Sequence, residues 1–344
     1  GLGTTLTLTS AQSVDEISAL MGTATTDDNV AVVATGMSAL QLNAVAAEIA
    51  EVGAITGDLT GLTSGVTASD IAILFGQYTG NTATVLATGM TSAQLTAIDA
   101  GDVAADGVTG TFTVASDVAS AQINAVLAKT ATGATVTVNA ATMDAAQKGV
   151  VEDNIAKVDT LTNLTLASGE DATEIAALLN AAGAGSVSVD ATGMSEAQLA
   201  AIHDAAGAAD SGDGIAKIAT NGITGDLAIS RTGLTEIEMN GLLGKASTAA
   251  NVTVDATNMS TTELQDLHDN IARIDSITNA TVTTTEEAAE IGSILSKATD
   301  ATVTATSMTA AELTAVADNI GNVAALGLGT TLTLTSAQSV DEIS

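Results

Sequence analysis

The sequence contains no cysteine and no proline, and its only aromatic residues are Phe75, Phe112 and Tyr78. The absence of cysteine excludes disulfides, thiolate metal sites and a cysteine nucleophile. The absence of proline, which averages about 5% of residues in proteins, is typical of regular elements repeated without Pro-rich linkers, so we predict no domain boundary. Because 46% of the residues are hydrophobic, the core has to consist of Ala, Val, Leu, Ile and Met.

Basic residues are also scarce. Eight Lys and Arg stand against 40 Asp and Glu, which gives a formal net charge of −32. Such a charge repels nucleic acid phosphates and anionic lipid, so we expect no nucleic acid partner. No apolar run reaches the roughly 20 residues of a membrane span, and no charged-then-apolar leader begins the sequence. We interpret the acidity as a solvated surface that keeps a long polymer soluble in a saline medium.

Repetition is what the sequence has in abundance. Residues 327–344 are identical to residues 1–18, so residues 1–326 form one period and the rest overlaps into the next. Six double units of about 54 residues fill this period, each with a strand, a turn ending in Met and a helix. The longest double unit carries an insertion around Ala209–Lys217. The methionines are Met37, Met90, Met143, Met194, Met259 and Met308.

The first half of each double unit predicts a strand and a capped helix. Segments such as TVTVNAAT at Thr135–Thr142 alternate apolar and polar residues, which predicts a strand with one buried face. We interpret each Met as half of a hydrophobic staple, and the stripe Leu264, Leu267, Ile271 and Ile274 as one helix face. After each Met comes a capping box that begins a helix: Ser38/Gln41, Thr91/Gln94, Asp144/Gln147, Ser195/Gln198, Ser260/Glu263 and Thr309/Glu312.

The second half predicts a shorter strand and a shorter helix. Its strands include TLTLTS at Thr5–Ser10 and TFTVAS at Thr111–Ser116. An acidic residue, which complements the helix dipole, precedes the Ile that begins each apolar face. The period therefore contains twelve βα coils. The Ile residues are Ile17, Ile71, Ile175, Ile237 and Ile291.

These coils predict an α/β fold. Strands joined through helices run parallel, and each crossover is right-handed. If every coil advances to the next strand, residues 1–344 form a single repeat array: a right-handed βα solenoid with one continuous parallel sheet and helices on one side. Strands lie about 4.8 Å apart and helices about 8 to 10 Å apart, so we expect a curved or superhelical solenoid. Its open face would carry Thr, Ser, Asp and Asn.

The pattern resembles two known classes of protein. The alternating coils resemble the leucine-rich-repeat class with helical backs in architecture only, because the LxxLxLxxN spacing is missing. The Ala/Thr/Gly/Asp-rich composition, as in TSAQLTAIDA at Thr91–Ala100, resembles that of giant tandem-repeat bacterial cell-surface proteins of marine or cyanobacterial type. This second resemblance implies an exported structural or adhesive polymer.

The sequence gives little indication of a catalytic site. The motifs GxxxxGK[ST], HExxH and DxDxDG are missing. His203 and His268 share one helix position, which we interpret as a solvated helix face because its residue type drifts among the units. The other four units carry Ala46, Asp99, Glu152 and Ala317 there.

One candidate metal site remains, in the inserted loop Ala209–Gly214. Asp210 and Asp213, with Asp204 upstream, offer hard oxygen ligands on a glycine-containing turn, which is the chemistry of a Ca²⁺ site. The EF-hand spacing is absent, and a plain solvated turn is the alternative. No other cofactor is expected.

The sequence therefore predicts a non-enzymatic structural repeat of a long extracellular filament, fibre or surface layer. Its partners would be adjacent copies of itself, end to end, with lateral self-association as a further mode. The alternative is an adhesive or ligand-binding surface. In that case the Thr-rich sheet face, with rows such as Thr5, Thr7 and Thr9, contacts glycans, another cell or ice.

Overall fold

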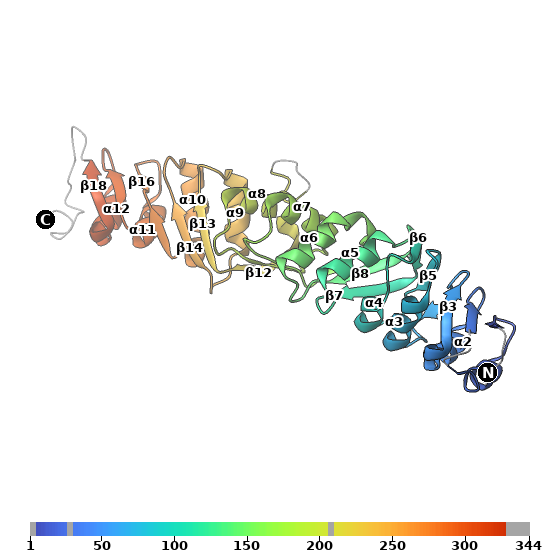
Figure 1. The fold of residues 1–344 in the computed structure, drawn as a ribbon. Coiled ribbons are helices and arrows are strands. Elements are labelled where there is room, and N and C mark those ends of the chain that lie inside the picture. Colours follow the sequence, from blue (N-terminus) through green and yellow to red (C-terminus); the bar gives the residue numbers. More distant parts are fainter. Residues whose placement is uncertain (1–4, 26–29, 206–209, 328–344) are drawn as a thin grey trace. The chain divides into compact units, whose positions relative to one another are not determined.

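The computed structural model describes residues 5–25, 30–205 and 210–327. The overlap at 328–344 and the part of the inserted loop at 206–209, including Ala209, lie outside the described residues. The chain divides into two compact units, unit 1 (Gly1–Asn163) and unit 2 (Leu164–Ser344). Each unit is a repeat-like α/β structure (Figure 1). A single array spanning both units stays a prediction.

Unit 1 alternates strands and helices through three double units. Its helices are α1 (Val14–Met21), α2 (Ala39–Ala47), α3 (Ala68–Gln77), α4 (Ser92–Thr96), α5 (Ser120–Ala128) and α6 (Ala145–Asp153). Its strands are β1 (Leu6–Leu8), β2 (Val30–Val33), β3 (Val52–Thr56), β4 (Leu62–Thr63), β5 (Ala83–Leu86), β6 (Val103–Thr109), β7 (Thr111–Ala115), β8 (Thr135–Asn139) and β9 (Thr160–Thr162).

Unit 2 repeats this order. Its helices are α7 (Ala172–Ala181), α8 (Glu196–His203), α9 (Glu236–Lys245), α10 (Thr261–Asp269), α11 (Ala288–Lys297) and α12 (Ala310–Asp318). Its strands are β10 (Thr165–Leu166), β11 (Val187–Asp190), β12 (Ile218–Thr224), β13 (Asp226–Ser230), β14 (Asn251–Asp255), β15 (Ser276–Thr278), β16 (Thr281–Val282), β17 (Ala301–Thr304) and β18 (Val323–Gly327).

The strands of the described residues form six three-stranded parallel sheets, and the expected single continuous sheet is not observed. Each sheet follows chain order, as in β7-β8-β9. Within a unit, consecutive sheets share one extended stretch of chain, because β6 runs through Gly110 directly into β7. The β6 part pairs with the strand before it, and the β7 part pairs with the strand after it.

A left-handed residue explains why the sheets are separate. The residue that follows each shared strand has a positive φ, which turns the chain so that its hydrogen-bonding edge cannot continue in the same ladder. Just before this residue the strand forms a single isolated bridge toward the next coil, as between Ile55 and Tyr78 or Val108 and Thr130. The positive-φ residues are Gly57, Gly110, Asn163, Gly225 and Asn279.

Each double unit has three strands, where the sequence predicts two. The additional strand, such as β3, lies between the first-half helix and the left-handed residue, and in most double units it follows a short 3₁₀ turn. Because the 3₁₀ turn before this strand interrupts the helix, the apolar stripe Leu264–Ile274 does not lie on one helix, contrary to the prediction from the sequence. Helix α10 ends at Asp269, and Ile271–Arg273 forms the 3₁₀ turn that leads to β15.

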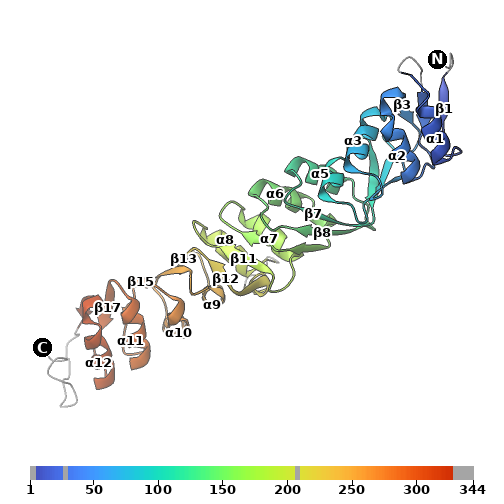
Figure 2. The ribbon, with the colours of Figure 1, turned by 90° about the horizontal axis from the view of Figure 1, so that it is seen from below.

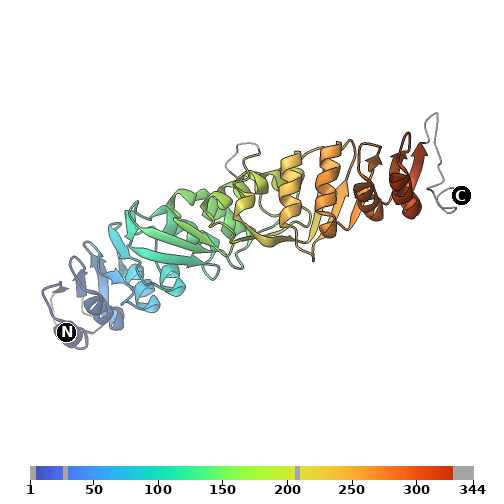
Figure 3. The same ribbon diagram turned by 180° about the vertical axis from the view of Figure 1, so that it is seen from behind.

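Helices cover one face of the strands. Each helix contacts the next one along the chain within its unit, so the helices stand side by side, as α5 and α6 do in Figure 2 and the yellow-to-red helices do in Figure 3. Val136 and Val138 of β8 are fully buried, whereas Thr135 between the turn and Val136 is exposed. This alternation confirms the prediction of strands with one buried face.

All six predicted capping boxes are present. The structure adds a second role for the Gln of four of them. Its side-chain carbonyl accepts the N-cap N–H, while its Nε2 donates to two carbonyls of the preceding coil. The acceptors are Ser10 and Gln12 for Gln41, Ser64 and Val66 for Gln94, Ser116 and Val118 for Gln147, and Ser168 and Glu170 for Gln198.

In the fifth double unit a different residue donates to the preceding coil. Glu263 stands where the others have Gln, and a carboxylate has no N–H to donate. The turn before α9 is longer there, and it supplies Arg231, whose guanidinium lies against the Glu263 carboxylate and donates to Leu234 O at 3.3 Å. The arginine therefore replaces the amide group as the donor to the preceding coil.

The scarce basic residues mostly join neighbouring coils. Five of the eight donate to backbone carbonyls of an earlier coil, which stabilises ends of elements that would otherwise leave acceptors unpaired. The surface is thereby left to the acidic residues. The bonds run from Lys129 to Val103, Lys157 to Thr130, Lys217 to Ala182, Lys245 to Ile218 and Arg273 to Leu243, at 2.6 to 2.9 Å.

The prediction for Ile237 is wrong. Thr235 is the N-cap of α9 and Glu238 its N3 residue, so the apolar face begins at Met239, which is 3% exposed. Ile237 lies two positions earlier and is 54% exposed. The capping box, and not the nearest Ile, sets which residue faces the core.

Candidate functional site

The inserted loop of unit 2 is folded around Asp204. This residue is the C-cap of α8, and its carboxylate accepts the backbone N–H groups of Asp210 at 2.7 Å and Gly212 at 3.0 Å. His203 Nδ1 donates to the same carboxylate at 2.7 Å. Asp210 and Gly212 both have positive φ, which curves the loop so that its N–H groups converge on the anion.

His203 is buried, so the prediction of a solvated helix face is wrong for this residue. It is 2% exposed and lies against Gly241 of α9, where a Cβ would collide with its ring. The inserted loop covers its other side near Gly212. The equivalent His268 has no such loop and is half-buried. Two features therefore distinguish His203: the insertion, and Gly241 in the next helix where Ser293 faces His268.

The three predicted calcium ligands do not converge. Asp204 is occupied by N–H donors, Asp210 accepts the hydroxyl of Thr235 at 2.6 Å, and Asp213 accepts Ser211 Oγ and the Gly214 N–H. Ca²⁺ takes six to eight oxygens, whereas this loop points N–H groups at its central carboxylate. No group of three or more His, Cys, Asp or Glu suited to a metal occurs in the described residues. The Ca²⁺ site therefore stays a prediction from sequence alone.

Asp204 makes the stability of unit 2 dependent on pH. Burial raises the pKa of Asp204, but the donors at Gly212, His203 and Asp210 outweigh burial and hold it below its ordinary value. A lowered pKa contributes stability above the unfolded value, about 3.9, that is lost as pH falls through the folded value. At neutral pH we expect Asp204→Asn to lower the free energy of unfolding by about 2 kcal/mol.

Urea unfolding at neutral pH and well below pH 4 tests this role of Asp204. The difference between parent and Asp204→Asn is expected to shrink at the acidic pH, where the parent carboxylate is also neutral. Asp318→Asn, at an exposed position of α12, is the control and should change little at either pH. An equal difference at both pH values would contradict the role of the charge.

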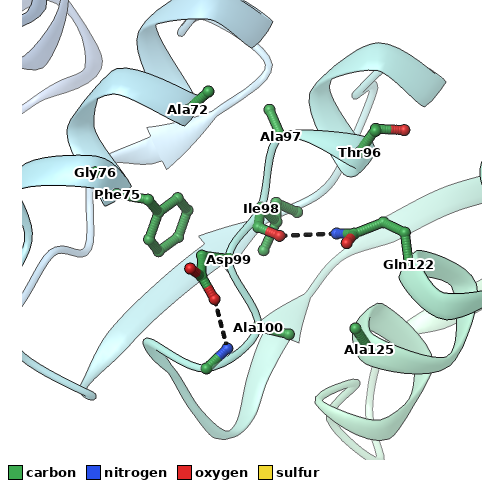
Figure 4. Close-up of a pocket in the computed structure, with 11 residues that line it drawn as sticks. Ala72, Phe75, Gly76, Thr96, Ala97, Ile98, Asp99, Ala100, Gln122 and Ala125 are labelled. Carbon is green, nitrogen blue, oxygen red and sulfur yellow. Dashed lines mark hydrogen bonds between the residues drawn. The ribbon is translucent and has the colours of Figure 1, made fainter.

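Unit 1 has a shallow depression of about 510 Å³ where α4 is short. Phe75 from α3 lies on one side of the Ala97–Ala100 segment, and Gln122 and Ala125 from α5 lie on the other (Figure 4). Gln122 Nε2 donates to Ile98 O at 2.7 Å. The N-cap of α5 is Ala119, whose side chain cannot accept a capping hydrogen bond, so Gln122 is not held in a capping box and makes this contact instead.

Few of the side chains that line this depression carry a charged or reactive group. Its one carboxylate, Asp99, accepts the Gly101 N–H at 2.9 Å. Asp102 lies nearby, and burial together with the Asp99 charge raises the pKa of Asp102. Among the described residues that line it, the only hydroxyl belongs to Thr96, and there is no serine, histidine or basic residue.

A second depression, of about 450 Å³, lies in unit 2 beside Arg231 and Glu263. Its walls are polar, with Glu236, Thr257 and Asn258 among them. Arg231 and Glu263 serve the contact between coils described above. The depression follows from the longer turn that carries Arg231.

His268 and Ser293 form the nearest approach to a catalytic pair. His268 Nδ1 lies 2.6 Å from Ser293 Oγ, but that hydroxyl donates to Glu290 O at 2.9 Å. The Ser293 hydroxyl therefore has a backbone acceptor as well as the histidine beside it. Burial, the largest cause, raises the pKa of the nearby Glu290.

The open face of the sheets carries threonine in register. In β7-β8-β9 the pairing places Thr113 beside Thr137 and Thr137 beside Thr160. Thr113 and Thr160 are exposed and Thr137 is half-buried. The predicted Thr-rich face therefore exists in this sheet of unit 1.

Comparisons with known proteins add no function. No protein-family model and no curated protein matches the sequence. Among solved structures, a chain from "Crystal structure of Rad7 and Elc1 complex in yeast" is similar over 79% of this chain and 75% of that chain, with 9% sequence identity and a TM-score of 0.23. So low a TM-score carries no argument about function. No helix in the described ranges is long and apolar enough to cross a membrane.

Proposed function

We propose that this chain is a structural repeat of a long extracellular filament, fibre or surface layer. In this proposal the βα coils continue end to end as a right-handed, curved solenoid, and neighbouring copies are the main partners. The role needs no catalysis and no cofactor, and it agrees with the resemblance to giant bacterial cell-surface proteins.

The exposure of Leu326 in β18 is the observation that carries the proposal. Leu326 is 43% exposed, whereas residues at the same place in other double units are fully buried. In four of the five other double units this residue forms a bridge to a residue just after the next second-half helix. Residues 327–344 have the same sequence as residues 1–18, so in a tandem array the coil expected to cover Leu326 would have the sequence of the first coil. The buried equivalents are Ile55, Val108, Ile223 and Ile277.

The helix beside β18 supports the same conclusion. Leu313 of α12 is half-buried, while its equivalents Leu42 and Leu264 are at most 1% exposed. Ile320, in the turn after α12, is 53% exposed. Burying a Leu or Ile side chain contributes about 1.5 to 3 kcal/mol, so covering this end with a further coil is strongly favoured.

Negative-stain electron microscopy of the purified chain tests the proposal. We expect elongated particles that associate end to end at high concentration, and Leu326→Lys should suppress that association because it places a charge in the contact. Leu86→Lys is the matched control, since Leu86 is 46% exposed but lies on the open face of β5. Compact, monodisperse particles without long-range order would rule the proposal out.

The threonine rows favour a second candidate function, an adhesive face. Parallel strands place Thr113, Thr137 and Thr160 about 4.8 Å apart across the sheet, which presents hydroxyls and methyl groups at regular spacing to glycans, another cell or ice. Substituting Lys for these threonines should abolish adhesion or effects on ice growth. Unchanged behaviour would remove this candidate.

A further inference from the structure

Strand β12 of unit 2 carries a wide bulge. Val187 pairs with Ile218 and Val189 with Ile223, so residues 219–222 have no partner in the ladder. At the apex of this bulge Asn221 has a φ of 54° and is exposed. Gly222 follows it, and a Cβ on Gly222 would lie 2.8 Å from Ala219 O. The tight turn therefore requires glycine after Asn221.

Strand β6 of unit 1 carries the same bulge with one chemical difference. Its register skips from Val103 to Val108, and its apex residue Asp106 has a φ of 55°. Gly107 follows, and its Cβ would lie 2.8 Å from Ala104 O. One backbone geometry thus carries an aspartate in unit 1 and an asparagine in unit 2.

We propose that Asn221 is a site of spontaneous deamidation, which converts it toward the acid that unit 1 has at the same place. The Gly222 backbone nitrogen attacks the side-chain amide carbon of Asn221. A C–N bond forms, and ammonia leaves with the proton of that nitrogen, which gives a five-membered succinimide. Solvent water then opens the ring at either carbonyl, and the product is aspartate or isoaspartate. The reaction needs only water.

Three features of the site favour this reaction. Gly222 has no side chain to hinder approach of its nitrogen to the amide carbon. Ring closure requires rotation of the backbone around Asn221, and this rotation breaks no ladder hydrogen bond because residues 219–222 are unpaired in the ladder. The exposure of Asn221 admits the water that opens the ring.

The same dipeptide elsewhere in the chain provides an internal control. Asn240–Gly241 is the other Asn-Gly pair, and it lies inside helix α9. The Asn240 amide donates to Asp266 at 3.1 Å and accepts from Asn270 at 3.1 Å. Ring closure there would have to break these bonds and the helix, so Asn240 should be protected while unit 2 is folded.

The two products differ in their effect on the bulge. Aspartate keeps the backbone and adds one negative charge, as Asp106 does in unit 1, where Lys157 Nζ lies 3.4 Å from its carboxylate. Isoaspartate inserts an extra carbon into the backbone and cannot keep the same turn. Asn221 is therefore a position at which a long-lived copy of this chain ages chemically.

Peptide mapping by mass spectrometry tests the inference on the full chain aged in mildly alkaline buffer. In the folded chain Asn221 should deamidate at least about tenfold faster than Asn240, and the two rates should converge in urea, because the difference comes from structure. Asn221→Gln, which can close only a slower six-membered ring, should lose the product at this position. Equal rates in the folded chain, or a ratio that urea leaves unchanged, would overturn the proposal.

A second measurement tests the equivalence of the two bulges. Asn221→Asp should melt at the same temperature as the parent, because the unit 1 bulge accommodates Asp106 with the same φ. A clear fall in melting temperature would show that unit 2 does not tolerate the aspartate product.

Discussion

Replacing Gln147 by Glu is expected to lower the free energy of unfolding of unit 1 by about 3 kcal/mol. Gln147 is 7% exposed, and its Nε2 donates to Ser116 O at 2.9 Å and Val118 O at 2.7 Å. A glutamate keeps the capping contact to the Asp144 N–H but places a carboxylate oxygen against two carbonyl oxygens. The loss of two donors and the new repulsion act together in a buried site.

Chemical denaturation of the parent and Gln147→Glu measures this effect. Glu312→Gln makes the reverse change at the equivalent, half-buried position of unit 2. It should leave stability unchanged or raise it, because the amide gains donors without losing the capping acceptor. If Gln147→Glu unfolded at the parent's denaturant concentration, the proposed role of the glutamines in joining coils would be wrong.

Gly110→Ala is expected to cost about 2 to 4 kcal/mol. Gly110 joins β6 to β7 with a φ of 86°, which L side chains rarely adopt. A Cβ there would also collide with Thr88 Oγ1, the acceptor of the Thr111 N–H. The substitution therefore strains the backbone and disturbs the contact between two sheets at once.

Thermal unfolding followed by circular dichroism tests Gly110→Ala against Gly133→Ala. Gly133 lies in an exposed turn of the same unit, where a Cβ would meet nothing within 4 Å. The control should melt like the parent or slightly above it, since alanine restricts the unfolded chain. Equal melting temperatures for both variants would show that the left-handed residue is not needed between the sheets.

The sequence was sufficient to predict the starts of the six first-half helices and the alternation of buried and exposed residues in the strands. A capping box is a local pattern of two residues, and strand alternation is a local period of two, so neither depends on distant packing. The third strand of each double unit was missed because it is defined by its partner. Val103–Thr109 pairs with β5 through a bulge. The sequence of the segment has no periodicity from which this register could be predicted.

The candidate site also depends on contacts between distant residues, which the sequence alone could not predict. Asp204, Asp210 and Asp213 are hard ligands by residue type, but which atoms face one another depends on loop backbone, where N–H groups point at Asp204. His203 is buried by an insertion and by the missing side chain of Gly241. In retrospect, Gly241 inside an otherwise regular helix is the sequence signal of a close neighbour.

We propose that β18 is an interior strand whose covering coil comes from the next period. Amide hydrogen exchange of Val323–Gly327 tests it most directly, in a chain extended by a second full copy of residues 1–326. The account predicts that exchange in this strand slows by at least about tenfold, toward the rate of β3, because the added coil pairs with it and buries Leu326. Equally fast exchange in the single and extended chains would contradict it.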